Sequence, residues 1–127
     1  MNYDVVKRAN PLDRTKELYY PAPVWGAEVS EDELSEEISY ASSVNQADVK
    51  AVISSFIEMI PRHLMKGETL RLGNLGIFRM SFESAGQEEQ EKVSASDIKK
   101  SKILFRPSMV LKKKIEKTSY TKVRSRS

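Results

Sequence analysis

The segment ETLRLGNLGIFRMSF, residues 68–82, decides the fold of this chain. Its first five residues alternate between polar and apolar side chains, which predicts a strand over residues 68–72. Gly73 to Gly76 has the composition of a tight turn, and Ile77 to Phe82 alternates again. The segment therefore predicts a β-hairpin.

Two helices are predicted before this hairpin. Ser30 is an N-cap with Glu33 three residues later, and Asn45 is a second N-cap with Asp48 at the matching position. Gly67 is expected to follow the end of the second helix. That helix carries a broad apolar stripe at three- and four-residue steps, suited to an intramolecular neighbour and to a subunit partner: Val49, Val52, Ile53, Phe56, Ile57, Ile60 and Leu64.

After the hairpin, the chain is expected to form a connection, a strand and a short helix. Residues 83–91 are polar and lack periodicity, which indicates a mobile connection or the tip of an extended arm. Ile98 to Arg106 regains strand character, Pro107 ends it, and Ser108 caps the last helix. From Thr118 onward the chain is short, polar and basic, which predicts a flexible tail.

Residues 1–29 are expected to form an N-terminal extension with short strands. Tyr3 to Lys7 alternates weakly, and residues 10–13 have the composition of a turn. In the extended piece over residues 18–25, Pro21 and Pro23 confine any strand to a sheet edge. Its aromatic side chains are expected to cover a core, with a partner surface as the alternative. The predicted division is 1–29, 30–117 and 118–127.

Charge is strongly polarised along the chain. Residues 99–127 hold eleven of the 21 Lys and Arg residues and a single acid, Glu116, although the whole chain carries only +3. Acidic side chains dominate residues 31–65 and 83–98. A basic block of this kind is typical of proteins that bind polyanions, because neutralising phosphates releases counterions. The alternative is a solvated surface that aids solubility.

Composition argues against several other classes. The 127 residues fit one ordinary domain with a short appendage, and without cysteine there is no disulfide or thiolate metal site. No apolar run approaches the ~20 residues that span a bilayer, and the N-terminus lacks a signal-peptide core. His63 is the only histidine, and no phosphate loop or nucleophile elbow occurs. We expect a cytoplasmic protein, not an enzyme, with no cofactor, metal, membrane or small-molecule substrate.

Taken in order, these elements resemble the HU and IHF histone-like DNA-binding family over residues 34–117. The turn region 43–49 is similar to the family's link between its first two helices. Residues 75–78, Leu-Gly-Ile-Phe, resemble the family's Phe-Gly-Thr-Phe turn, and residues 105–112 resemble its Phe-Arg-Ala-Gly-Lys-Ala-Leu-Lys segment. The resemblance implies an α+β fold: two helices, a three-stranded antiparallel sheet with a short arm, and a short C-terminal helix. It also implies a homodimer in the bacterial nucleoid.

The leader and the arm look like a variant branch found in Bacteroidetes-type bacteria. Residues 7–12, Lys-Arg-Ala-Asn-Pro-Leu, fit that branch's N-terminal motif. Family members that kink DNA carry a basic arm tipped by Arg-Asn-Pro, but residues 84–91 here are acidic and contain no proline. From this arm we expect no wedge between base pairs, and therefore DNA that stays nearly straight or bends smoothly.

The leading hypothesis is a DNA-binding protein that holds duplex DNA through its phosphates with low sequence specificity. The alternative is a protein-interaction module on the same scaffold with little DNA affinity. Arg79, Arg106 and Lys112 match basic positions of the family, and the other candidates follow from charge. The predicted DNA-binding residues are Arg71, Arg79, Lys99, Lys100, Lys102, Arg106, Lys112 and Lys113.

Overall fold

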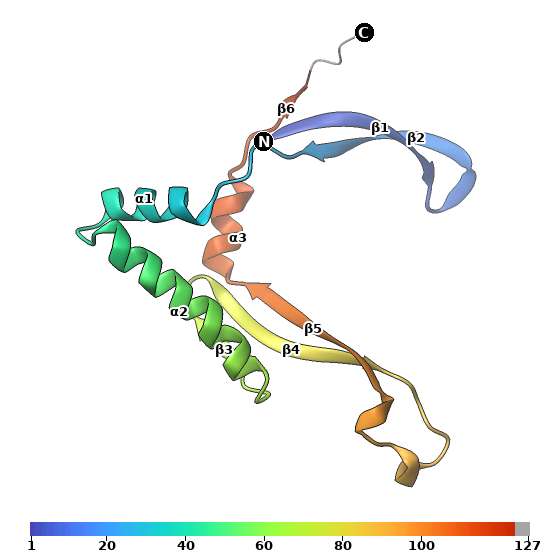
Figure 1. The fold of residues 1–127 in the computed structure, drawn as a ribbon. Helices are drawn as coiled ribbons and strands as arrows, with labels where there is room; N and C mark the ends of the chain where they lie inside the picture. The colour runs from blue at the N-terminus through green and yellow to red at the C-terminus, as the bar shows by residue number, and fades with distance from the viewer. Residues whose placement is uncertain (124–127) are drawn as a thin grey trace. The chain divides into compact units, whose positions relative to one another are not determined.

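The computed structural model describes residues 1–123, which form two compact units (Figure 1). The first unit contains Met1–Val29 and the chain from Ile115 onward, and the second contains Ser30–Lys114. Within the described residues there are three α-helices and two three-stranded sheets. The α+β class predicted from the sequence is confirmed. The arrangement differs from the expected one because the N-terminal extension has a sheet of its own.

The sheet of the first unit is a long hairpin with one added strand. Strands β1 (Asn2–Asn10) and β2 (Asp13–Val24) pair antiparallel from Asn2 opposite Val24 to the turn. The strands are much longer than the sequence predicts. Pro21 and Pro23 lie in β2, which is an edge strand in the order β2-β1-β6. Their position agrees with the expectation for proline, since an edge strand needs no hydrogen bond from them.

The third strand lies within residues 118–127, for which the sequence predicts a flexible tail. β6 (Thr121–Lys122) pairs parallel with β1, with Thr121 opposite Asn2. The amide of Thr121 donates to the Met1 carbonyl at 3.0 Å, and the amide of Val123 donates to the Tyr3 carbonyl at 2.9 Å. Composition alone suggested a frayed end, but the free edge of β1 supplies acceptors. Residues 124–127 of the predicted tail lie outside the described residues.

The first two helices of the chain begin at the predicted caps. Helix α1 spans Glu31–Ala41 and helix α2 spans Gln46–Leu64. The Ser30 side chain accepts a hydrogen bond from the amide of Glu33 at 3.1 Å, and the Asn45 side chain accepts one from the amide of Asp48 at 2.9 Å. Both caps satisfy amides that a helix start leaves without partners.

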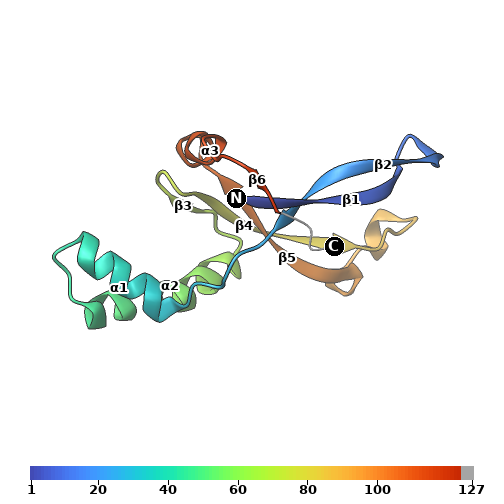
Figure 2. The same cartoon turned by 90° about the horizontal axis from the view of Figure 1, so that it is seen from above.

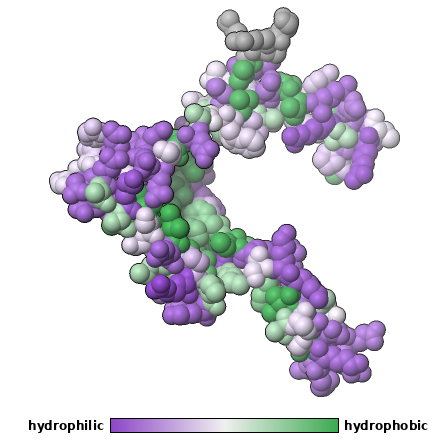
Figure 3. All heavy atoms as spheres, viewed as in Figure 1, coloured by the Kyte–Doolittle hydropathy of each residue, from purple (hydrophilic) through white to green (hydrophobic). Residues whose placement is uncertain are grey.

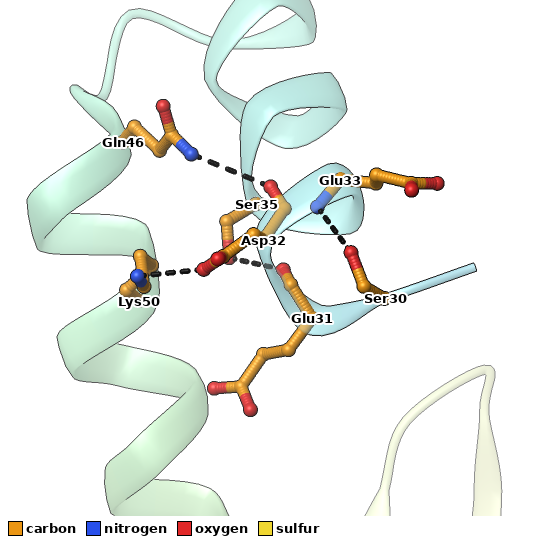
Figure 4. A network of polar contacts seen from close by, with 7 residues as sticks. All are labelled: Ser30, Glu31, Asp32, Glu33, Ser35, Gln46 and Lys50. Carbon is orange, nitrogen blue, oxygen red and sulfur yellow. Dashed lines mark hydrogen bonds and ion pairs between the residues drawn. The ribbon is translucent and has the colours of Figure 1, made fainter.

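Polar contacts join α1 to α2 (Figure 4). The Lys50 ammonium lies 2.6 Å from the Asp32 carboxylate, and this hydrogen bond and charge raise the pKa of Lys50. Gln46 donates to the Asp32 carbonyl at 3.3 Å. The fully buried Ser35 hydroxyl donates to the Glu31 carbonyl at 2.8 Å. The two contacts at Asp32 connect α1 with α2, whereas the Ser35 hydrogen bond lies within α1.

The sheet of this unit has the order β3-β4-β5 and contains the predicted hairpin. The strands are β3 (Leu70–Leu72), β4 (Gly76–Ser84) and β5 (Ile98–Pro107), all antiparallel. Gly76 has a φ of +147°, which a side chain would strain. In Figures 1 and 2, the distal ends of β4 and β5 extend as an arm beyond helix α2.

Residues 83–91 lie at the tip of the β4–β5 arm, which is one of the two alternatives that the sequence leaves open. The 3₁₀ turns of the tip, Gln90–Lys92 and Ala95–Asp97, lead back into β5. Asp97 is only 7% exposed, and it accepts hydrogen bonds from the Gln87 side chain at 2.8 Å and the Ser94 amide at 2.9 Å. The Ala85 amide donates to the Asp97 carbonyl at 2.8 Å. Sequence periodicity does not reveal such a network because its contacts are polar and irregular.

Helix α3 (Met109–Glu116) starts at Ser108, as predicted. The Ser108 hydroxyl accepts from the Leu111 amide at 3.1 Å and donates to the Asn74 carbonyl, while its own amide donates to the Leu75 carbonyl at 3.0 Å. Ser108 therefore ties the start of α3 to the turn between β3 and β4.

The described part of the chain buries little apolar surface. Val49 and Leu64 are its only buried apolar side chains. Large apolar side chains on α2 and on β4 and β5 remain partly open to solvent, including Val52, Phe56, Phe82 and Ile103. Hydrophobic residues accordingly reach the surface over the middle of the second unit, whereas the arm tip is hydrophilic (Figure 3).

Candidate nucleic-acid interface

The register of the second sheet places five of the eight predicted residues on one face. Arg71 lies opposite Ile77, which lies opposite Arg106, and Arg79 lies opposite Leu104. Further along the arm, Ser81 pairs with Lys102 and Glu83 pairs with Lys100. Since residues opposite one another share a face and alternate residues return to it, one side of the sheet carries the basic residues. We call this side the basic face: Arg71, Arg79, Lys100, Lys102 and Arg106.

The other side of the sheet is apolar and holds no basic residue in the paired register. Phe78 lies opposite Phe105 there, with ring centroids 4.7 Å apart, and Met80 lies opposite Ile103. The strict two-residue period therefore separates an apolar face from a charged one. All five side chains of the basic face are exposed, so this face can meet a ligand.

The basic face is not uniformly polar. Ile77 and Leu104 lie between Arg79 and Arg106, and these residues with Phe105 line a shallow cavity of about 150 Å³. The Arg79 guanidinium also donates to the Thr69 hydroxyl at 3.3 Å, which restrains its side chain. A surface that combines positioned cations with small apolar contacts suits the sugar and phosphate edge of a duplex.

The remaining three predicted residues lie elsewhere. A register shift after Glu83 leaves Lys99 outside the paired register, and its ammonium donates to the Ser96 carbonyl at 3.1 Å. Lys112 and Lys113 are exposed on α3, whose start is tied to the turn between β3 and β4. The structure thus groups the sheet residues together and separates Lys99 from them.

The cations of the basic face form no ion pairs among the described residues. Within residues 1–123, none of the eight predicted residues takes part in an ion pair. Glu83, opposite Lys100, is the one acid in the paired register of this face. Unpaired cations on a common surface attract an anion with several charges, because each new contact adds to the same field.

The only histidine of the chain, His63, lies on α2 and not on the β3-β4-β5 sheet. His63 Nδ1 lies 3.4 Å from the Glu68 carboxylate at the exposed end of α2. Across residues 1–123, no group of three His, Asp or Glu side chains is placed to hold a metal ion. None of the helices there is long and apolar enough to cross a membrane.

An apolar cavity lies in the first unit. It has a volume of about 670 Å³, and its walls include Tyr3, Tyr19, Pro21, Pro23 and Tyr120. Tyr19 is 70% exposed and Tyr120 is 65% exposed. Most of the Tyr19 ring is therefore open to solvent, and the expectation that the aromatic side chains of residues 18–25 cover the domain core stays a prediction.

Comparison with protein families assigns the fold. Residues 1–122 match the model of HU-HIG, described as an HU domain fused to wHTH, Ig, or glycine-rich motif. The chain belongs to the HU-HIG family. The predicted resemblance to HU-type proteins is confirmed, and the match includes the N-terminal extension. No curated protein matches this HU-HIG chain.

Three solved structures share the fold. A putative bacterial DNA-binding protein from Bacteroides vulgatus is 14% identical with a TM-score of 0.66, covering 98% of the HU-HIG chain and 49% of its own. A point mutant of HU from Thermotoga maritima is 21% identical with a TM-score of 0.50. The match covers 68% of the HU-HIG chain and 99% of the Thermotoga maritima chain. Anabaena HU, in a cocrystal with DNA, is 17% identical with a TM-score of 0.54. The match covers 71% of the HU-HIG chain and 100% of the Anabaena HU chain. The HU-HIG chain thus spans about half the length of the Bacteroides vulgatus protein.

Sequence reasoning missed the apolar pair Ile77 and Leu104 and did not distinguish Lys99 from its neighbours. Counting alternate positions outward from the turn at Gly76 finds Ile77 on the same face as Arg79. The separation of Lys99 depends on the register shift after Glu83, which no local pattern signals.

Proposed function

We propose that this HU-HIG chain is a non-enzymatic protein of the bacterial nucleoid that binds duplex DNA with low sequence specificity. The observation that carries the proposal is the basic face, where five cations share one side of the β3-β4-β5 sheet without ion pairs among the described residues. Its HU-type fold, shared with the Anabaena HU in its DNA cocrystal, supports the same conclusion.

Binding on this face is electrostatic. Arginine and lysine side chains contact phosphates along the backbone, which positions the duplex without reading its bases. The contacts extend along the arm from Arg71 and Arg106 to Lys102 and Lys100, in the order of the strand register. Lys112 and Lys113 add positive charge on α3, the helix that follows β5 in the chain. No helix is needed in the major groove.

The active species is a homodimer. The groove on α2 lined by Ala51, Val52, Ser55, Phe56 and Met59 is apolar and open, with a volume of about 390 Å³. A single chain leaves Val52 55% exposed and Phe56 45% exposed. A second copy that covers this stripe gives both chains a shared core, as a two-fold interface requires.

A salt series of gel shifts with duplex DNA tests the proposal. We expect the double variant Lys102→Ala and Arg106→Ala to weaken binding equally for unrelated sequences and to reduce the salt slope by about one for each phosphate that the variant no longer neutralises. Lys99→Ala is the matched control, because Lys99 lies outside the basic face, and it is expected to leave the slope unchanged. An unchanged slope in the double variant contradicts the proposal.

A protein-interaction module is the second candidate, and the cavity in the first unit favours it. Exposed tyrosine rings beside Pro21 and Pro23 form an apolar surface of the kind that interfaces use. If wild-type protein fails to shift duplex DNA even at low salt, while Tyr19→Ala abolishes its association with a partner protein, the interaction module replaces the DNA-binding proposal.

A further inference from the structure

The hairpin of the first unit presents an apolar tip to solvent. β1 and β2 pair along nearly their whole length, and residues Pro11 and Leu12 lie between them at the turn. The Leu12 side chain is 96% exposed, the highest value among the exposed large apolar side chains described. Packing within the chain therefore does not account for a leucine at this position.

Side chains hold this turn in one conformation. The Leu12 amide donates to the Asn10 side chain at 3.0 Å, and the Thr15 amide and hydroxyl donate to the Asp13 carboxylate at 3.1 and 2.6 Å. The two hydrogen bonds from Thr15 lower the pKa of Asp13, so this carboxylate is ionised at neutral pH. A tip that is already ordered loses less entropy when it binds.

Cations surround the tip. Arg8, Arg14 and Lys16 are exposed, and in the part of the chain that the structure describes none of them joins an ion pair or a side-chain hydrogen bond. Lys7, in contrast, is neutralised by Glu17, with 2.9 Å between the charged atoms. These three unpaired cations outnumber the Asp13 carboxylate, so the net charge near the turn is positive.

The tips of the two hairpins differ in charge. The tip of the β4–β5 arm carries Glu88, Glu89 and Glu91, which repel phosphate. The β1–β2 tip combines cations with an exposed leucine and a proline. Proteins that open a base step from the minor groove use apolar side chains of this type, with cations on the flanking phosphates.

We propose that the β1–β2 hairpin is a second DNA-binding element, in which Leu12 and Pro11 insert at a base step in the minor groove while Arg8, Arg14 and Lys16 contact phosphates. This inference rests on the proposed binding of duplex DNA. It changes the expectation of a nearly straight duplex, which depends on the β4–β5 arm alone. The hairpin supplies the wedge that the arm lacks, so bound DNA is locally unstacked and bent.

The test uses the full chain and a short duplex that contains 2-aminopurine and carries a dye at each end. Wild-type protein is expected to raise the 2-aminopurine fluorescence and to shorten the distance between the dyes. Leu12→Ser abolishes both signals but leaves the salt slope unchanged, because it removes no phosphate contact. Val93→Ser is the matched control, since Val93 is a 61% exposed apolar residue near the tip of the other hairpin, and it keeps both signals.

The triple variant Arg8→Ala, Arg14→Ala and Lys16→Ala tests the phosphate contacts separately. It is expected to reduce the salt slope by up to about three, one for each cation removed. If wild-type protein binds the duplex and Leu12→Ser keeps the wild-type fluorescence and dye distance, the wedge is overturned while the proposed function stands. If wild-type protein binds no duplex at low salt, the proposed function fails first, and the wedge fails with it. Equal far-ultraviolet circular dichroism spectra verify that all variants fold.

Discussion

At the scale of single residues, Gly76 determines whether β4 can begin next to β5 in the sheet of the second unit. At Gly76, β4 begins with a φ of +147°, and an added Cβ atom would lie 2.9 Å from the Phe105 ring and against the Arg106 carbonyl. The turn and the close approach of β5 both depend on this glycine. The basic face is built on the same two strands, so the geometry of Arg106 depends on Gly76 as well.

Gly76→Ala is expected to destabilise the protein by more than about 1 kcal/mol, because the backbone conformation is strained and the neighbouring strand must move. Chemical denaturation measures the free energy of unfolding. Gly86→Ala is the control, since no atom lies within 4 Å of its added Cβ. Equal stability of the two variants would show that the turn relaxes without cost.

At the scale of elements, the β4–β5 arm carries a polar network instead of an apolar core. Hydrogen bonds from the Ser94 amide and the Gln87 side chain lower the pKa of Asp97 from its ordinary value of 3.8. A carboxyl group with a lowered pKa in the folded arm stabilises the arm while it is ionised. That stabilisation is complete above the ordinary value and is lost as the pH falls through the lower, folded value.

We therefore expect the arm tip to loosen below about pH 4. Amide exchange measured by NMR over a pH series checks this, and the informative signal is the Ala85 amide, which donates to the Asp97 carbonyl. Asp97→Ala should expose this amide already at neutral pH. Asp13→Ala is the control, because it removes a similar carboxylate from the other hairpin. Wild-type protection of Ala85 in Asp97→Ala would rule out the carboxylate as the organiser of the tip.

The elements also show how far local sequence patterns reach. The caps at Ser30, Asn45 and Ser108 were predictable because each bonds to an amide three residues away. The pairing of Thr121 with Asn2 was not predictable, because its partners are separated by most of the chain. The basic face was predictable only in part. Strand alternation places Arg79 and Lys102 on it, but a register shift that no local pattern signals displaces Lys99.

For the whole molecule, the proposed homodimer predicts that folding and dimer formation are one process, because the apolar stripe of α2 is exposed in a single chain. We expect the melting temperature to rise with protein concentration, as mass action requires when only the dimer is folded. Val52→Glu should leave the chain largely unfolded at micromolar concentration, because it places a charge in the shared core. Glu58→Gln on the same helix is the control. A constant melting temperature and a folded, monomeric Val52→Glu variant contradict the dimer.

The pairing of β6 with β1 also constrains the order of folding. All of the second unit lies between these two strands in sequence, so the first sheet gains its third strand only when the chain closes a loop that contains the whole second unit. An already compact second unit shortens that loop and lowers the entropic cost of closing it. During synthesis, the β1–β2 hairpin is made before the second unit, and until β6 is added it remains a two-stranded ribbon, which is marginally stable by itself. Pairing of β6 with β1 is therefore expected to be the last step in forming the first unit.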